Sequence, residues 1–192
     1  RTRPSFWLGW LAVKLAYLFS RATGIVTMVS ELRMIKRTAD GTLIDYGAVC
    51  YRAITTTGVQ FMANDFAALA GSEISNFKYH GWGGVAGATA PAAPPAEAKT
   101  DTALTANLLT AYVISSPAPT ATAEAGATGN WQYTAQVTTT FGAATYINEH
   151  GLFNQPAVSG ATLWDCSVYA NTPMAQNESM TFQYILTIQS GG

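Results

Sequence analysis

Glu149 and His150 are the residues of this sequence whose types best suit chemistry, because a carboxylate beside an imidazole can exchange protons with a substrate. They lie in the segment ATYINEHGLF, which is typical of a β-strand, and adjacent side chains of a strand point to opposite faces. No Ser or Cys in a nucleophile context accompanies them. We therefore expect no enzymatic activity and a structural role, in which Glu149 or His150 hydrogen-bonds the backbone where the strand bends at Gly151.

The histidines and cysteines form no metal or cofactor motif. His80 and His150 are far apart in the chain, with no Cys or second His close to either, whereas structural zinc sites use closely spaced ligands. The segment NFKYHGWGG contains glycines but lacks the spacings of phosphate-binding loops. Cys50 and Cys166 suit two free thiols packed as small hydrophobes, or one disulfide in an oxidising compartment. No cofactor is expected.

The elements that must position these residues are mostly strands. The last third of the chain holds four short runs rich in Thr, Val, Tyr, Phe and Ile, each followed by a turn signal. Apolar and polar residues alternate over 131–139, whereas 182–188 is apolar enough to be buried on both sides or covered by a partner. In 163–169 the alternation places Cys166 inward beside Trp164. The sequence predicts a mainly β fold, an antiparallel β-sandwich of jelly-roll or Ig-like kind.

Shorter elements precede this unit. Ala39-Asp40-Gly41 predicts a turn, and Thr55, Thr56 or Thr57 can cap one short internal helix that ends at Gly71. The segments LIDYG and AVCYRAITT around that turn are predicted to be paired strands. Two further strands are predicted over 74–80, ending in a glycine-rich bend, and over 111–114. Long Pro/Ala-rich loops are expected at 85–101 and 115–129.

Charge is sparse and unevenly distributed. Charged residues make up 11% of the chain, against roughly 25% in typical globular domains, and such a surface suits burial against partner subunits. Residues 1–52 contain eight Lys and Arg against three Asp and Glu, whereas 53–192 contain two against eight. The basic first quarter is expected to face something acidic. Specific nucleic-acid binding is not expected, because the β region has only two lysines for backbone phosphates.

The first 37 residues predict a hydrophobic and basic helical arm, followed by a β-sandwich domain over 38–192. Lys14 and Arg21 interrupt the apolar run, which is therefore too short to span a bilayer in the usual way. An amphipathic helix outside the β core must bury its apolar face against a partner subunit, a membrane or its own domain. The residues predicted to make partner contacts are Phe6, Trp7, Trp10, Leu11, Leu15, Leu18 and Phe19.

Three blocks of the sequence resemble a group of tailed-bacteriophage virion structural proteins. They are TADGTLIDYGAVCYRAITTTGVQFMANDF, then ISNFKYHGWG with the later DTAL, and finally YINEHGLFNQ, GATLWDCSVYA and MTFQYILTI in this order. The likeness covers about 38–192, with insertions in the loops and the arm outside it. Trp164, Cys166 and Ile185 stand where the group usually has Leu, Arg and Thr.

The resemblance implies a capsid decoration, or cement, protein on the outside of a phage head. Such a protein is expected to be a homo-oligomer, a dimer or trimer, that contacts the major capsid protein and bridges capsomers at the capsid surface. Two alternatives remain from the residues: a receptor- or glycan-binding tail or fibre module that uses Trp82, Trp131 or Tyr133, and a surface protein anchored in a membrane through residues 5–29. The resemblance carries over no catalytic residue.

Overall fold

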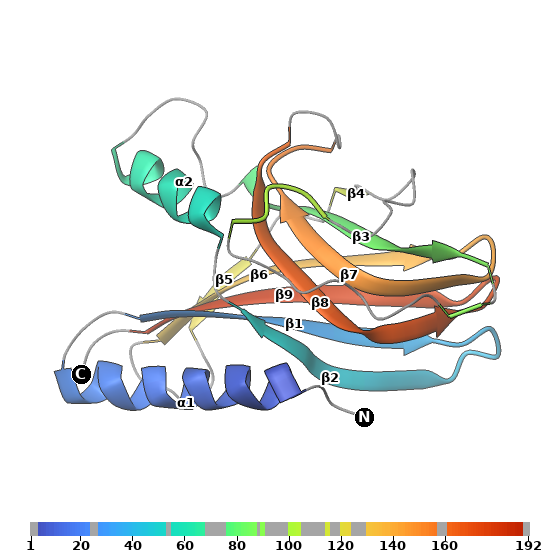
Figure 1. Cartoon of the computed structure of the whole chain (residues 1–192), viewed down its shortest axis with the longest axis horizontal. Helices are drawn as coiled ribbons and strands as arrows, with labels where there is room; N and C mark the ends of the chain where they lie inside the picture. Colours follow the sequence, from blue (N-terminus) through green and yellow to red (C-terminus); the bar gives the residue numbers. More distant parts are fainter. Residues whose placement is uncertain are drawn as a thin grey trace.

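The chain forms two antiparallel β-sheets that pack face to face, with one helix at each end of the first third of the sequence (Figure 1). This computed structural model describes residues 4–23, 27–52, 55–67, 76–87, 89–90, 100–104, 114–115, 120–123, 130–156 and 161–189. Within these residues, the predicted mainly β, antiparallel sandwich is confirmed.

One sheet has five strands in the order β2-β1-β9-β6-β5, and the other has four in the order β4-β3-β7-β8. The helices are α1 (Pro4–Thr23) and α2 (Thr56–Phe66). The strands are β1 (Thr27–Arg37), β2 (Leu43–Arg52), β3 (Tyr79–Ala86), β4 (Ile114–Ser115), β5 (Thr120–Ala123), β6 (Asn130–Thr140), β7 (Thr145–Phe153), β8 (Leu163–Met174) and β9 (Ser179–Gln189).

β9 lies at the centre of the five-stranded sheet. It pairs along its whole length with β1 on one edge and with β6 on the other. The side chains of Phe182, Tyr184 and Leu186 face the core between the sheets, and Ile185 on the opposite side is also buried. The prediction that the last strand is largely buried on both sides is therefore confirmed.

The expected boundary between arm and sandwich is corrected by the position of β1. Residues 27–37 were assigned to the arm, but they form a strand between β2 and β9 and contribute Leu32 and Met34 to the core. Of the residues expected to form the arm, α1 is the described part that lies outside the sheets (Figure 1). The basic residues of this segment obscured its alternation, because Arg33 and Arg37 point to the solvent while Leu32 and Met34 point inward.

The turn at Ala39-Asp40-Gly41 is confirmed, but it joins β1 to β2. The two strands expected after it are one strand, β2, with a bulge in its pairing opposite Met34 and Ile35. Gly47 makes this bulge possible, since its φ of 64° is unfavourable for other residues, and its N–H donates to Asp45 Oδ1 at 2.6 Å. Thr55 is the cap of α2, accepting a hydrogen bond from Gly58 N–H at 3.0 Å.

The glycine-rich segment after Tyr79 is a strand, not the expected bend. β3 runs through these glycines to Ala86 because close packing requires them: a Cβ on Gly84 would lie 1.9 Å from the carbonyl oxygen of Tyr146. The expected loop at 85–101 therefore begins inside β3, and the expected loop at 115–129 contains β5. Residues 68–75, 91–99, 105–113, 116–119 and 124–129, which include parts of the expected helix end, strands and loops, lie outside the described residues.

A bulge in β8 changes which residues face the core. Leu152 is opposite Asp165 and Phe153 is opposite Leu163, so Trp164 is the extra residue. Trp164 packs between the sheets and donates from Nε1 to Tyr184 Oη at 2.7 Å, whereas Cys166 packs on the outer side of the four-stranded sheet with Phe153 and Leu163. The prediction that Cys166 lies beside Trp164 is wrong, because strict alternation does not continue across a bulge.

A buried ion pair connects β1 to the turn between β8 and β9. Lys36 Nζ lies 2.6 Å from Glu178 Oε2 and donates to the Pro173 carbonyl oxygen at 2.7 Å. Glu178 Oε2 also accepts from Ala175 N–H at 2.6 Å. Burial alone raises the pKa of Glu178, but the bonds from Ala175 and Lys36 outweigh it and hold the pKa below its ordinary value of 4.5.

Glu178→Gln is expected to lower the free energy of unfolding by about 2 kcal/mol at pH 7, because Lys36 keeps its charge but loses the carboxylate. The difference from wild type should shrink as the pH falls through the pKa of Glu178, since a carboxyl with a depressed pKa stabilises the fold only while it is ionised. Urea unfolding at several pH values measures this. Glu31→Gln is the matched control: its 3.7 Å contact with Arg33 is partly exposed, and its loss should cost less than about 1 kcal/mol.

Candidate partner-binding surface

Glu149 and His150 point to opposite sides of β7, as the strand periodicity predicts. Glu149 Oε1 accepts from Cys166 Sγ at 3.3 Å on the outer side of the four-stranded sheet. His150 faces the other sheet, where its ring centroid lies 5.0 Å from that of Phe182 on β9. Both side chains are fully buried, so the backbone of β7 separates the carboxylate from the imidazole and neither contacts solvent. The two residues cannot act together on a substrate in this arrangement.

His150 has a partner that the sequence did not reveal. Its Nε2 lies 2.9 Å from Nδ1 of His80, although the two residues are distant in the chain. Antiparallel pairing of β3 with β7 sets Trp82 opposite His150 and His80 opposite Leu152, which makes the two histidines diagonal neighbours on one face. Burial lowers the pKa of His80 to about 3, so the imidazole of His80 is neutral at physiological pH.

Gly151 lies inside β7 and not at a bend. A Cβ at this position would come within 2.8 Å of side-chain carbons of both Leu104 and Leu163. Leu104 belongs to the segment DTAL and packs with Phe153 and Leu163 on the outer side of the four-stranded sheet. A larger residue here would therefore displace these leucine side chains, whereas glycine lets Leu104 of the loop at 100–104 pack directly on the strand.

Asp165 is the other fully buried carboxylate, and it connects the sheets. Its Oδ2 accepts from Ser30 Oγ on β1 at 3.2 Å, and its Oδ1 accepts from Ser167 Oγ at 3.2 Å. Among the described residues, no group of three or more His, Cys, Asp and Glu is placed to hold a metal ion. Cys50 and Cys166 are buried in different clusters and do not form a disulfide. These buried polar groups are parts of the interior and do not form an accessible site.

The residues predicted to contact a partner lie on α1, along the outer side of β1 and β2 (Figure 1). Val13 and Ala16 are half-buried, whereas the larger apolar side chains that the structure describes on this helix are exposed; Leu15 is 55% exposed and Leu18 is 65% exposed. The side chains of Phe6 and Trp7 lie outside the described residues. We define the helix patch as Trp10, Leu11, Leu15, Leu18 and Phe19.

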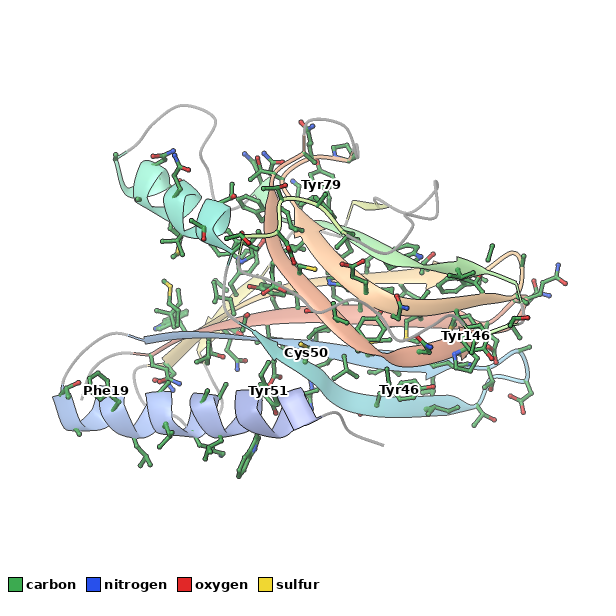
Figure 2. All side chains as sticks on the ribbon, viewed as in Figure 1. Phe19, Tyr46, Cys50, Tyr51, Tyr79 and Tyr146 are labelled. Atoms are coloured by element: carbon green, nitrogen blue, oxygen red, sulfur yellow. The ribbon has the colours of Figure 1, made fainter. Side chains whose placement is uncertain are left out.

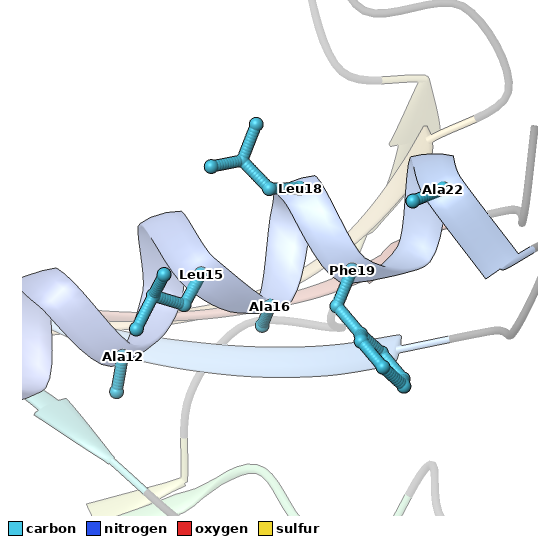
Figure 3. Close-up of a pocket in the computed structure, with 6 residues that line it drawn as sticks. All are labelled: Ala12, Leu15, Ala16, Leu18, Phe19 and Ala22. Atoms are coloured by element: carbon cyan, nitrogen blue, oxygen red, sulfur yellow. The ribbon is translucent and has the colours of Figure 1, made fainter.

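The helix patch is a continuous apolar surface. Leu11, Leu15 and Leu18 follow at spacings of four and three, which places them on one face of the helix. Ala12, Ala16 and Ala22 lie between the larger side chains, and a shallow apolar hollow results, lined by Leu15, Leu18, Phe19 and the three alanines (Figure 3). The ammonium of Lys14 lies 5.8 Å from the ring centroid of Trp10, which puts a positive charge beside the patch.

A second exposed apolar group lies at the start of β2 and was not predicted from the sequence. Leu43, Ile44 and Tyr46 are all exposed, and Figure 2 shows Tyr46 on β2 away from α1. Asp40 and Asp45 are exposed in the same hairpin. We define these five residues as the hairpin patch. The signal in the sequence was the run Leu43-Ile44, because adjacent apolar residues at an edge cannot both face the core.

The aromatic residues expected for glycan binding are mostly internal. Trp82 is 4% exposed and stacks on Phe182, with ring centroids 5.4 Å apart, so its predicted role as a sugar platform is wrong. Tyr133 is partly buried and donates to the carbonyl oxygen of Phe77 at 2.6 Å. Trp131 alone of the three is exposed, at 56%. Among the described helices, none is long and apolar enough to cross a membrane.

Comparison with known proteins returned no match among protein-family models, curated proteins or solved structures.

The buried His80 is expected to make stability depend on pH between about 6.5 and 3. The unfolded chain binds a proton at this imidazole below its ordinary pKa, whereas the folded chain does so only near pH 3. Stability should therefore fall with decreasing pH by about 1.4 kcal/mol per pH unit. His80→Gln keeps a hydrogen-bonding group for His150 and should remove the contribution of His80 to this slope in urea titrations between pH 6 and 5. Glu178→Gln is the control and should change the slope in that window little, because a carboxyl with an ordinary pKa of 4.5 is mostly ionised there.

Proposed function

We propose that this chain is a non-enzymatic structural protein of a tailed-phage particle, of the decoration or cement type, which binds the outside of the capsid and bridges capsomers. The observation that carries the proposal is the way the resembling motifs meet. NFKYHGWG leads into and forms β3, YINEHGLF forms β7 and GATLWDCSVYA forms β8, and these three strands are neighbours in one sheet. The segment DTAL packs Leu104 over Gly151 of β7 and Leu163 of β8.

The motifs that resemble phage virion proteins also pack against one another in one core. This supports a common fold with those proteins more than a chance likeness of short sequence segments. MTFQYILTI forms β9, whose Phe182 packs against Trp82 of β3 and His150 of β7. Motifs separated by long stretches of sequence therefore contact each other in space. The motif residues contribute to packing. The resemblance therefore supports a kind of structural protein and indicates no catalytic reaction.

The surface also suits a protein that works by contact. The helix patch presents large apolar side chains away from the sandwich, and few charges oppose its burial. In a lattice, repeated copies convert modest individual contacts into strong attachment. The buried carboxylates and histidines described above are consistent with a protein that needs no accessible catalytic groups.

The experiment uses particles of the phage whose genome encodes this chain. Mass spectrometry should detect the chain in purified particles, and gold-labelled antibodies should decorate the head. Purified protein should bind saturably to heads that lack it. Heads that do not bind the protein, together with gold label at the tail only, would contradict the decoration role.

Exposed Trp131 supports one alternative, a glycan-binding module. A glycan array should then show selective binding that Trp131→Ala abolishes, whereas the decoration proposal predicts no selective binding. Flotation with liposomes, using the full chain and a version that begins at Thr27, which lacks α1 but keeps β1, tests the membrane alternative through the helix. Neither assay depends on capsid binding, so each separates its alternative from the proposal.

A further inference from the structure

The outer side of the four-stranded sheet has a row of small residues that crosses three strands. Gly81 on β3 lies opposite Gly151 on β7, and Gly151 lies opposite Cys166 on β8. Paired residues of neighbouring strands share one face of the sheet, and these three strands lie side by side (Figure 1). The rows on either side carry larger side chains, which are Tyr79, Phe153 and Leu163 on one side and Glu149 and Val168 on the other. The sheet surface is therefore low along the row of small residues.

Leu104 occupies the space above this row. A Cβ on Gly151 would lie 2.8 Å from Cδ2 of Leu104, so the leucine side chain lies where a larger residue of β7 would project. A Cβ on Gly81 would meet the ring of Phe153 at 2.8 Å. Leu104 and Phe153 pack with Leu163, Cys166 and Val168 in a cluster that is separate from the two clusters between the sheets.

Leu104 supplies the buried contact that the segment 100–104 makes with the sheet. The other residues of this segment are exposed, except for Asp101, which is half-buried. The free energy of burying one leucine side chain corresponds to an open fraction of about one molecule in 50. Separating the two sheets exposes the clusters between them and is far rarer. Parts of a protein that have few buried apolar contacts open locally while the rest stays folded.

We propose that residues 100–104 form a latch, which opens while the sandwich stays folded and then uncovers the outer face of β7 and β8 around Cys166. Opening exposes Phe153 and Leu163, and these apolar side chains then form a contact surface that the closed protein lacks. Cys166 reports the opening, because its side chain is fully buried in the same cluster and forms no disulfide. The latch does not depend on the virion role proposed above.

The test measures how fast N-ethylmaleimide labels each cysteine of the full chain in urea below the unfolding transition. Cys50→Ala leaves Cys166 as the reporter of the latch. Cys166→Ala is the matched variant and leaves Cys50, which packs between the sheets with Leu32 and Met34, as the reporter of the interior. Cys166 should react about 50-fold more slowly than in the unfolded chain, with little dependence on urea, because local opening exposes little surface. Cys50 should react more slowly still, and its rate should rise steeply with urea.

Three further substitutions separate the latch from the core. Leu104→Ala removes most of the buried side chain and should raise the labelling rate of Cys166 at least about tenfold. Thr102→Ala changes an exposed residue of the same segment and should leave that rate unchanged. Val137→Ala weakens the core between the sheets, so it should accelerate the labelling of Cys50. It should leave the labelling of Cys166 unchanged, because the open and closed states of the latch share the same core.

Each of three outcomes would overturn the proposal. One is a labelling rate of Cys166 that rises with urea as steeply as the rate of Cys50. Another is equal acceleration of both thiols by Val137→Ala, since Cys166 is then reached only by global unfolding. The last is a Leu104→Ala variant that labels like its parent. The first two measurements decide the matter even where Leu104→Ala prevents folding. No capsid enters the assay, so failure here leaves the decoration proposal intact.

Discussion

A strand with both faces largely buried needs hydrogen-bond partners for the backbone N–H and C=O groups along both of its edges. In the five-stranded sheet that strand is β9. It holds β1 on one side and β6 on the other through pairing along its full length. The hydrophobic clusters between the sheets depend on its side chains, since Phe182 packs with Trp82 and Tyr184 with Trp164. The last segment of the chain must therefore dock between the first strand and β6 before the five-stranded sheet is complete, which makes the fold rich in long-range contacts.

Buried polar groups connect strands that are distant in the chain, both between the two sheets and within one sheet. Asp165 on β8 accepts a hydrogen bond from Ser30 on β1, and His80 pairs with His150 where β3 and β7 face β9. Lys36 and Glu178 connect β1 with the turn before β9. Each of these contacts forms only when strands from distant parts of the chain come together, so they favour one arrangement of the strands over others. They also explain why residues suited to catalysis can be internal in this protein.

The surface of the protein, unlike its interior, has large apolar side chains that remain exposed in the described part of the chain. The sandwich buries its own core, yet the helix patch and the hairpin patch expose large apolar side chains on a surface with few charges. Large exposed apolar groups of this kind are typical of surfaces that become buried against another molecule. The proposed structural role draws on these areas, because the carboxylates and histidines described above are buried.

The sequence alone determined the class of fold and the local elements. Alternation in β6, the turn at 39–41, the cap at Thr55, the exposed leucines of α1 and the separation of Glu149 from His150 all follow from periods and propensities acting over a few residues. Tertiary structure decided the rest. The place of β1 in the sheet, the His80–His150 pair, the burial of Trp82 and the bulge that separates Trp164 from Cys166 depend on which strands pair and in what register. The pattern of residues within one segment does not indicate which distant segment it pairs with or in what register. That information is therefore visible only in the folded chain.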